Sequence, residues 1–351
     1  MSKKYVLIAG MLVLIGILII IAAEEKQERP EKNFFEKSLH YTANGLRYWY
    51  SKEQGGMEKI TGVPIDEVNC TKCHVKSCDT CHVKIENGKS HYSTEVARSE
   101  AACRDCHGYG GPQKDENGKE IPITDVHFKK GMKCMECHTI REIHGDGTEY
   151  NSAAQEGALD AKCENCHRSL SKSESHVVHG AKLDCQACHV LERPSCHNCH
   201  FDTRIKEKKS DSFTFKNLHF LVNKNGKVTL GTMLTFVYQN KPMISFGTKF
   251  PHDVRLEGRK CEECHNTKII KDIKKNKFNL ATFENGVMKN VEGIVPVLDG
   301  FKWNLFWLNY ENGKWVPIPN APEPIVRYSR YCSPLTKEQF AKLEKTVTKK
   351  K

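Results

Sequence analysis

Hydrophobic residues are concentrated at the beginning of the chain. Residues 5–23 are nineteen consecutive positions without a charged side chain, and Lys3 and Lys4 precede them. A membrane-spanning helix needs about 20 apolar residues, whereas the apolar region of a signal peptide is usually about 7 to 15 residues long. The length therefore predicts a transmembrane anchor over residues 1–23, with the two lysines on the inner side of the membrane. A signal peptide cleaved after Ala23 is the alternative.

Beyond the apolar segment the chain is mostly polar. Residues 24–66 are predicted to link the anchor to the next domain. Within them, residues 24–35 form a charged stalk and residues 36–50 an aromatic-rich helix that caps that domain. Residues 67–267 have weak helical periodicity and many Gly, Asp and Asn residues, which predicts short helices and loops. We expect these residues to form one domain.

Alternating and apolar runs indicate strands in two later stretches. The first is an insertion at about residues 212–250, where Asn225 and Gly226 are a strong two-residue hairpin signal. The second is residues 268–351, where Asn-Gly pairs at 285–286 and 312–313 mark further turns and the chain ends in a basic tail. The predicted fold is therefore a mainly α and irregular core with a β-hairpin insertion and a small β-rich C-terminal subdomain.

The core is punctuated by a repeated motif, Cys-x-x-Cys-His. It occurs eight times and uses sixteen of the seventeen cysteines. The eight copies are Cys70/Cys73/His74, Cys78/Cys81/His82, Cys103/Cys106/His107, Cys134/Cys137/His138, Cys163/Cys166/His167, Cys185/Cys188/His189, Cys196/Cys199/His200 and Cys261/Cys264/His265.

This spacing is typical of covalent haem attachment. Two thiols three residues apart can bond to the vinyl groups of one porphyrin, and the adjacent histidine then binds the iron. Zinc sites and disulfides also use paired cysteines, but neither explains a histidine after the second cysteine in all eight copies. The sequence therefore predicts eight haems c, which would also supply much of the buried apolar surface.

The net charge of +11 could suggest a nucleic-acid partner. The ionised propionates of eight haems would offset most of that excess, so we expect no nucleic acid. The basic excess lies mainly in residues 268–351, which hold sixteen Lys and Arg against eight acids. A solvated basic face is the simpler interpretation, and docking to an acidic redox partner or an anionic surface is the alternative.

Nine further histidines are available as second axial ligands for eight irons. They are His40, His91, His127, His144, His176, His179, His197, His219 and His252. We expect seven or eight of them to be ligands. An iron held by two histidines has no position for substrate and can only transfer electrons, so the count favours an electron carrier over an enzyme.

The placement of these histidines ranks them. His91, His127, His179 and His252 each lie 6 to 12 residues before a motif, which favours them as ligands, whereas His40 and His219 have the weakest support. His197 lies inside a motif and is expected to ligate a neighbouring haem. Residues 185–200 are therefore predicted to be a node where one short segment ligates neighbouring haems.

On these motifs, residues 70–265 resemble the multihaem c-type cytochromes, in particular the octahaem group that includes hydroxylamine oxidoreductase and tetrathionate reductase. The octahaem reductases of tetrathionate or nitrite have a lysine as proximal ligand of the catalytic haem, whereas all eight motifs here end in histidine. The chain is also similar to electron conduits, including quinol-oxidising and filament-forming cytochromes. The resemblance implies haem c as cofactor and a haem domain on the outer, periplasmic or extracellular side of the cytoplasmic membrane, in which the N-terminal segment is expected to be anchored.

Three functions follow as expectations. The first is a membrane-anchored electron carrier of anaerobic or extracellular respiration, with the quinol pool or redox proteins as partners. The second is an oxidoreductase acting on nitrite, hydroxylamine or tetrathionate at one open haem, and the third is a subunit of a cytochrome filament. The seventeenth cysteine, Cys332, is expected to be buried and unpaired.

Overall fold

The computed structural model describes residues 34–68, 75–107, 113–114, 120–121, 125–190, 195–209, 212–250 and 252–347. The predicted N-terminal anchor, the first motif (Cys70, Cys73 and His74) and the last four residues lie outside this part of the chain. Within the described ranges, no helix is both long and apolar enough to cross a membrane.

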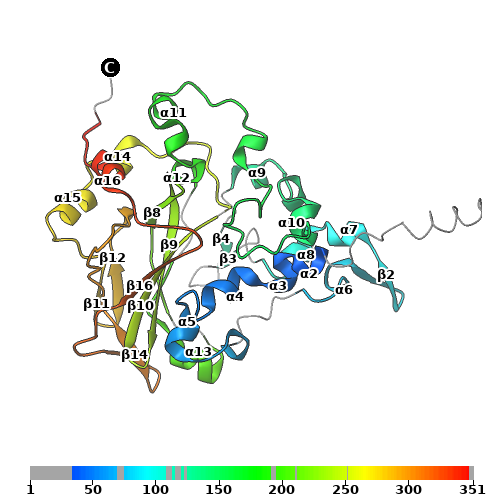
Figure 1. Ribbon diagram of the computed structural model, residues 1–351, viewed down its shortest axis with the longest axis horizontal. Coiled ribbons are helices and arrows are strands. Elements are labelled where there is room, and N and C mark those ends of the chain that lie inside the picture. Colours follow the sequence, from blue (N-terminus) through cyan, green and yellow to red (C-terminus); the bar gives the residue numbers. More distant parts are fainter. Residues whose placement is uncertain are drawn as a thin grey trace, which may run out of the picture.

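A mixed β-sheet forms one half of the molecule (Figure 1). Its centre is an antiparallel meander of β8 (Leu218–Lys224), β9 (Lys227–Tyr238) and β10 (Lys241–Thr248). β13 (Gly293–Pro296) pairs in parallel with β8, and β16 (Ile325–Ser329) pairs in parallel with β10. The order along the sheet is β13-β8-β9-β10-β16, and the short strand β6 (Cys199–His200) also pairs with β9.

The predicted Asn-Gly turns are confirmed. Asn225 and Gly226 have φ values of 50° and 85° and connect β8 to β9. A left-handed backbone at both turn positions matches the twist of the flanking strands, and Asn and Gly tolerate it best. The same pair connects β11 (Ala281–Glu284) to β12 (Val287–Asn290) and β14 (Leu308–Glu311) to β15 (Lys314–Pro317).

Both faces of the sheet are covered by apolar side chains. Alternate residues of a strand point to opposite faces. Phe220, Val222 and Val295 belong to one buried cluster, whereas the intervening Leu221 and Ile294 belong to another. Cys332 lies in the first cluster and is a free, buried thiol, as predicted, and burial raises its pKa to about 11.

The structure differs from the predicted boundary between the β insertion and the C-terminal subdomain. Strands from residues 218–248 and from residues 293–329 form one sheet. The last motif, residues 261–265, lies between them in the sequence, and its helix α14 (Cys261–Cys264) precedes α15 (Lys268–Lys274). The two segments therefore share a core and form a single unit.

Short helices and loops form the other half, drawn in blue to green in Figure 1. They are α2 (Phe34–Lys37), α3 (Leu39–Thr42), α4 (Asn44–Tyr50), α5 (Met57–Thr61), α6 (Asp79–His82), α7 (Thr94–Ala97), α8 (Glu100–Arg104), α9 (Val126–Lys129), α10 (Ile140–His144), α11 (Glu174–His179) and α12 (Cys185–His189). A hairpin of β1 (Val83–Glu86) and β2 (Lys89–Tyr92) follows α6. After the seventh motif comes α13 (Phe201–Glu207), and α16 (Lys337–Leu343) lies near the C-terminus.

The predicted capping helix over residues 36–50 is divided into three pieces. Ser38 caps the start of α3 by accepting a hydrogen bond from the Tyr41 amide. Ala43 has a left-handed backbone with φ of 52°, so it ends α3 and separates it from α4. As a result, α3, which carries His40, and α4 are separate helices.

The helical half buries few of its own side chains. Between residues 76 and 186 the buried residues in the described part are Asp125, Ser152, Ala154 and Ala158. Large apolar side chains there are exposed, including Ile85, Leu170 and Val177. The sheet, in contrast, buries Phe220 and Phe246 completely. Porphyrins bonded to the motif cysteines would cover apolar surface in the helical half that its own side chains leave exposed.

Candidate haem sites

Six of the described motifs fold as a single helical turn. The amide of the motif histidine donates to the carbonyl of the first cysteine in motifs two, three, four, five and eight, at 2.8 to 3.0 Å. The sixth motif forms α12. A helical turn places residues i, i+3 and i+4 on one face, so both sulfurs and the imidazole of each motif point to the same side. This arrangement fits covalent attachment of one haem per turn.

Each of these six motif histidines faces one of the nine other histidines. The pairs and their ring-centroid separations are His82 with His144 (6.0 Å), His107 with His40 (5.9 Å), His138 with His252 (5.9 Å), His167 with His127 (6.2 Å), His189 with His176 (6.0 Å) and His265 with His179 (6.1 Å). Every pair therefore combines a candidate proximal ligand with a candidate distal ligand.

The constant separation indicates a common spacer between the rings. The angle between ring planes ranges from 18° for His82 and His144 to 80° for His40 and His107, yet the separation hardly changes. Rings in direct contact would pack at separations that depend on their angle. Two metal–nitrogen bonds of about 2 Å, as measured for zinc, plus half a ring on each side give roughly 6 Å. The pairs thus fit an iron bound by two imidazoles.

The candidate distal histidines lie mainly on short, capped helices. Ser38 caps α3 with His40, Asp125 caps α9 with His127, and Thr139 caps α10 with His144. α11, capped by Ser173, carries both His176 and His179. These two face different motifs, the sixth and the eighth, so a single helix can ligate two haems. Side-chain caps at the N-termini fix where these short helices begin.

Hydrogen bonds at Nδ1 orient several of the paired rings. The acceptors are Ser171 O for His176 (3.0 Å), Ser175 O for His179 (2.9 Å), Arg255 O for His189 (3.4 Å), Lys342 O for His265 (2.8 Å) and Glu142 Oε2 for His138 (2.6 Å). A proton held at Nδ1 makes Nε2 the nitrogen that can bind a metal, which is the usual arrangement for ligating histidines. Burial also lowers the pKa of His40 and His107, which favours the neutral form required of a ligand.

The other two interpretations of the cysteines receive no support. None of the fifteen cysteines in the described ranges forms a disulfide. Among the same residues, no group of three or more His, Cys, Asp or Glu side chains is arranged to hold a metal ion. A disulfide framework or a set of tetrahedral zinc sites would require such contacts.

Electrostatic interactions between thiols indicate which motifs are neighbours. Burial raises the pKa of Cys81, Cys103, Cys137 and Cys264, and for each of them a thiol of another motif raises it further: Cys106, Cys134, Cys166 and Cys188 respectively. A hydrogen bond with Cys185 raises the pKa of Cys163. Motifs two, three, four, five, six and eight therefore follow one another as a continuous row.

The segment before the last motif holds the end of this row together. The amides of Arg255 and Arg259 donate to the carbonyls of His189 and Cys188, at 2.8 and 3.1 Å. The Arg259 guanidinium is buried and donates to Ala187 O at 3.2 Å and to Val190 O at 2.8 Å. The segment that precedes motif eight is thus joined to motif six and the residue after it by several hydrogen bonds.

The seventh motif has a different structure. Cys196 and His197 form β5, which pairs with β7 (Phe213–Thr214), and Cys199 and His200 form β6. Asn198 between them has φ of 55°. Neighbouring residues of a strand point to opposite faces, so Cys199 and His200 do not converge as they do in a helical turn. As folded, this motif does not fit a haem in the way that the other six do.

Both imidazoles of the seventh motif are buried and hydrogen-bonded at both nitrogens. His197 contacts Thr235 Oγ1 at 2.8 Å and Phe306 O at 3.2 Å. His200 contacts Thr203 Oγ1 and, at 2.6 Å, Asn309 Oδ1. The predicted node at residues 185–200 is therefore present only in part. His189 faces another histidine, His176. His197 and His200 instead form hydrogen bonds with residues 306–309.

Two further candidate ligands are placed elsewhere. His219 lies on β8 with Arg259 Nη2 3.1 Å from its Nδ1. Burial and that positive charge lower its pKa to about 3. His91 is exposed on β2. Its role stays a prediction, because the first motif and His74 lie outside the described residues.

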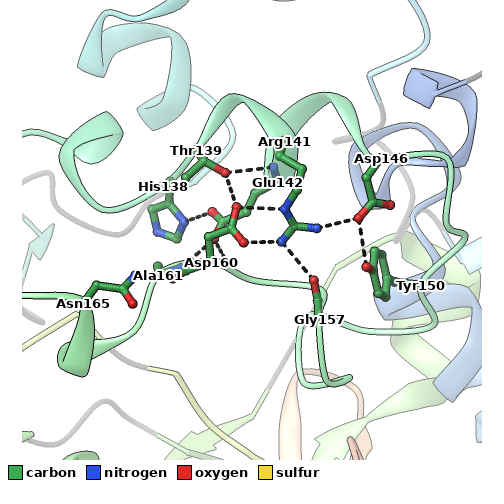
Figure 2. Close-up of polar contacts among 10 residues, drawn as sticks. All are labelled: His138, Thr139, Arg141, Glu142, Asp146, Tyr150, Gly157, Asp160, Ala161 and Asn165. Atoms are coloured by element: carbon green, nitrogen blue, oxygen red, sulfur yellow. Dashed lines mark hydrogen bonds and ion pairs between the residues drawn. The ribbon is translucent and has the colours of Figure 1, made fainter.

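Glu142 is a functional candidate that the sequence interpretation missed (Figure 2). Its carboxylate accepts from His138 and, through the other oxygen, from the amides of Asp160 and Ala161. Burial alone would raise its pKa, but these hydrogen bonds lower it below the ordinary value. The available signal was the i, i+4 spacing of His138 and Glu142, which brings the two side chains together where the helix begins.

An arginine holds the loop that contacts Glu142. Arg141 donates to both carboxylate oxygens of Asp160, at 2.8 and 2.6 Å, and to Asp146 at 2.7 Å (Figure 2). It also donates to Gly157 O at 2.9 Å. The bond from Arg141 lowers the pKa of Asp160, while bonds from Thr148 and Arg141 outweigh burial and lower that of Asp146 to about 2. Bidentate arginine–carboxylate pairs add geometric precision, here to the backbone that binds Glu142.

Replacing His197 by alanine should destabilise the protein and leave the haem spectrum unchanged. His197 is fully buried and links Thr235 on β9 to Phe306. Loss of the side chain leaves a cavity and unpaired polar groups, which should cost roughly 3 kcal/mol. Denaturant unfolding measures the loss, and the Soret and visible bands measure the haems. An altered spectrum with unchanged stability would instead support the prediction that His197 is a haem ligand.

Comparison with known proteins finds limited similarity. No protein-family model matches the chain, and no solved structure matches it. A curated relative is the dissimilatory sulfite reductase MccA of Wolinella succinogenes, which is 24% identical over 169 aligned residues. The match covers 37% of this chain and 23% of the relative, so the chain spans less than a quarter of that protein's length. Together with the motifs and paired histidines, this similarity supports a multihaem c-type cytochrome.

Proposed function

We propose that this chain is an electron carrier in which a row of haems c, most of them held by two histidines, connects an electron donor to an electron acceptor. The observation that carries the proposal is the set of six histidine pairs, all with ring centroids 5.9 to 6.2 Å apart. When bound, the haems supply one-electron redox chemistry. The protein's part is to occupy both axial positions, which excludes substrate.

The order of the motifs supports a path rather than a set of isolated centres. Electrostatic interactions between thiols link motifs two to six in sequence and then motif six to motif eight. A membrane location outside the cytoplasm, with the quinol pool or redox proteins as partners, belongs to the same proposal. It rests on the N-terminal apolar run and on haem c chemistry.

A second candidate is reduction of a small sulfur or nitrogen compound at one open haem. The similarity to a protein named a dissimilatory sulfite reductase favours it. This function requires one iron with a single histidine ligand.

Carbon monoxide binding and sulfite-dependent oxidation of reduced viologen together separate the two functions. An iron with two histidine ligands does not bind carbon monoxide readily, so the reduced carrier, with six haems at paired histidines, should bind at most two carbon monoxide molecules per chain. It should also fail to oxidise reduced viologen when sulfite is added. One bound carbon monoxide per chain, together with sulfite-dependent viologen oxidation, would replace the carrier by the enzyme.

A further inference from the structure

His138 differs from other paired histidines in the charge of its hydrogen-bond acceptor. Its Nδ1 lies 2.6 Å from the Glu142 carboxylate. The acceptors of His176, His179, His189 and His265 are backbone carbonyls at 2.8 to 3.4 Å. Asp125 lies near His127, but at 3.4 Å from its Nδ1, and it already accepts from the amides of His127, Phe128 and Val254.

Glu142 is fixed in the position that this bond requires. Its side chain is only 3% exposed. One oxygen accepts from the amides of residues 160 and 161, which leaves the other oxygen directed at His138. Arg141 in turn holds Asp160 by two parallel hydrogen bonds (Figure 2). A carboxylate with three donors is a pure acceptor, so the proton between it and His138 belongs to the imidazole.

We propose that Glu142 is a positioning residue that lowers the reduction potential of the haem held by His138 and His252. This inference rests on the proposed function, since it assumes that both histidines bind iron. A hydrogen bond to a full negative charge makes the imidazole a more basic ligand, and a more basic ligand favours ferric over ferrous iron. Because the pair is partly buried, the low local dielectric strengthens the hydrogen bond between Glu142 and His138.

The location of this haem gives the effect a consequence for electron transfer. The fourth motif is interior to the row, because Cys134 lies near Cys103 of the third motif and Cys137 near Cys166 of the fifth. A haem of lowered potential at that point is an uphill step between its neighbours. Glu142 would then set the rate at which electrons cross from one half of the row to the other.

Replacing Glu142 by glutamine tests the role. In a spectroelectrochemical titration of the holoprotein, the midpoint potential of one haem should rise by about 59 mV or more. For a one-electron couple, this shift corresponds to an increase of about tenfold in the equilibrium constant for reduction. The other midpoints should stay in place. The matched control is Glu136→Gln, which removes an equal charge from within the fourth motif, where Glu136 accepts from the Lys133 amide and not from His138. Its midpoints should move by less than a third of that amount.

Two results would overturn the proposal. One is an unchanged set of midpoints in Glu142→Gln, and the other is an equal shift in both variants, which would mean that charge alone acts through space. If Glu142→Gln loses haem, Glu142→Asp provides the test, because it keeps the charge but withdraws it by one methylene. It should raise the same midpoint by a smaller amount, and no rise would contradict the role. Failure of the carrier function would instead appear in the wild type, as sulfite-dependent oxidation of reduced viologen.

Discussion

Without haem, the protein should keep its sheet and lose the ordered structure of residues 76–186. Those residues bury almost none of their own side chains, and the four buried positions described there are Asp125, Ser152, Ala154 and Ala158. The sheet has a core of its own, in which Phe220, Met233 and Ile244 are fully buried. Conformational entropy of about 1 to 2 kcal/mol per residue must be offset by buried surface, and only the sheet can supply it without porphyrins.

Hydrogen–deuterium exchange of haem-free protein measures this difference directly. A chain beginning at residue 34 and made in the cytoplasm would escape haem attachment. Amides of β8, β9 and β10 should be protected at least a hundredfold, or about 2.7 kcal/mol, whereas those of residues 76–186 should exchange as in an unfolded chain. The holoprotein is the control, with both halves protected. Protection across residues 76–186 in the haem-free chain would contradict this description of the helical half.

Replacing His179 by alanine should convert one haem per chain from low spin to high spin. His179 faces His265 at 6.1 Å and is oriented by the carbonyl of Ser175. Its loss removes one axial ligand but leaves the covalent attachment at Cys261 and Cys264. Low-temperature electron paramagnetic resonance of the oxidised variant should show one new equivalent of high-spin ferric iron, with the total haem content unchanged.

The matched control for this substitution is His219→Ala. His219 is also a partly buried histidine outside the motifs, but its neighbour is Arg259. The control should gain no high-spin signal. A high-spin signal in His219→Ala, or none in His179→Ala, would show that the assignment of distal ligands from ring separations is mistaken.

The sequence predicted the local turns, because they depend on residues a few positions apart, whereas covalent haem attachment at the motifs stays a prediction. The Cys-x-x-Cys-His spacing corresponds to a helical turn in six described copies. The Asn-Gly pairs at residues 225, 285 and 312 each form the expected tight turn. The seventh motif has the same letters but folds as strands, since pairing with β7 and β9 determines its backbone there. Tertiary context overrides local preference in such short segments.

The identity of each histidine pair could not be predicted from nearness in the sequence. His127 precedes the fourth motif but faces His167 of the fifth. His252 precedes the eighth motif but faces His138 of the fourth. His40, which had weak support, faces His107 across 67 positions of chain. These contacts depend on how the short helices pack against one another. The parallel pairing of β13 with β8 and of β16 with β10 is equally non-local.

Near-infrared magnetic circular dichroism of the oxidised holoprotein tests the central claim most directly, because its charge-transfer band reports the pair of axial ligands on low-spin ferric haem. Six described histidine pairs predict at least six bis-histidine haems per chain. Quantified against protein concentration, the bis-histidine band should therefore correspond to six or more haems. A band intensity that corresponds to fewer than six bis-histidine haems per chain, with the other haems high spin or bound by another ligand, would contradict the proposed row of bis-histidine haems.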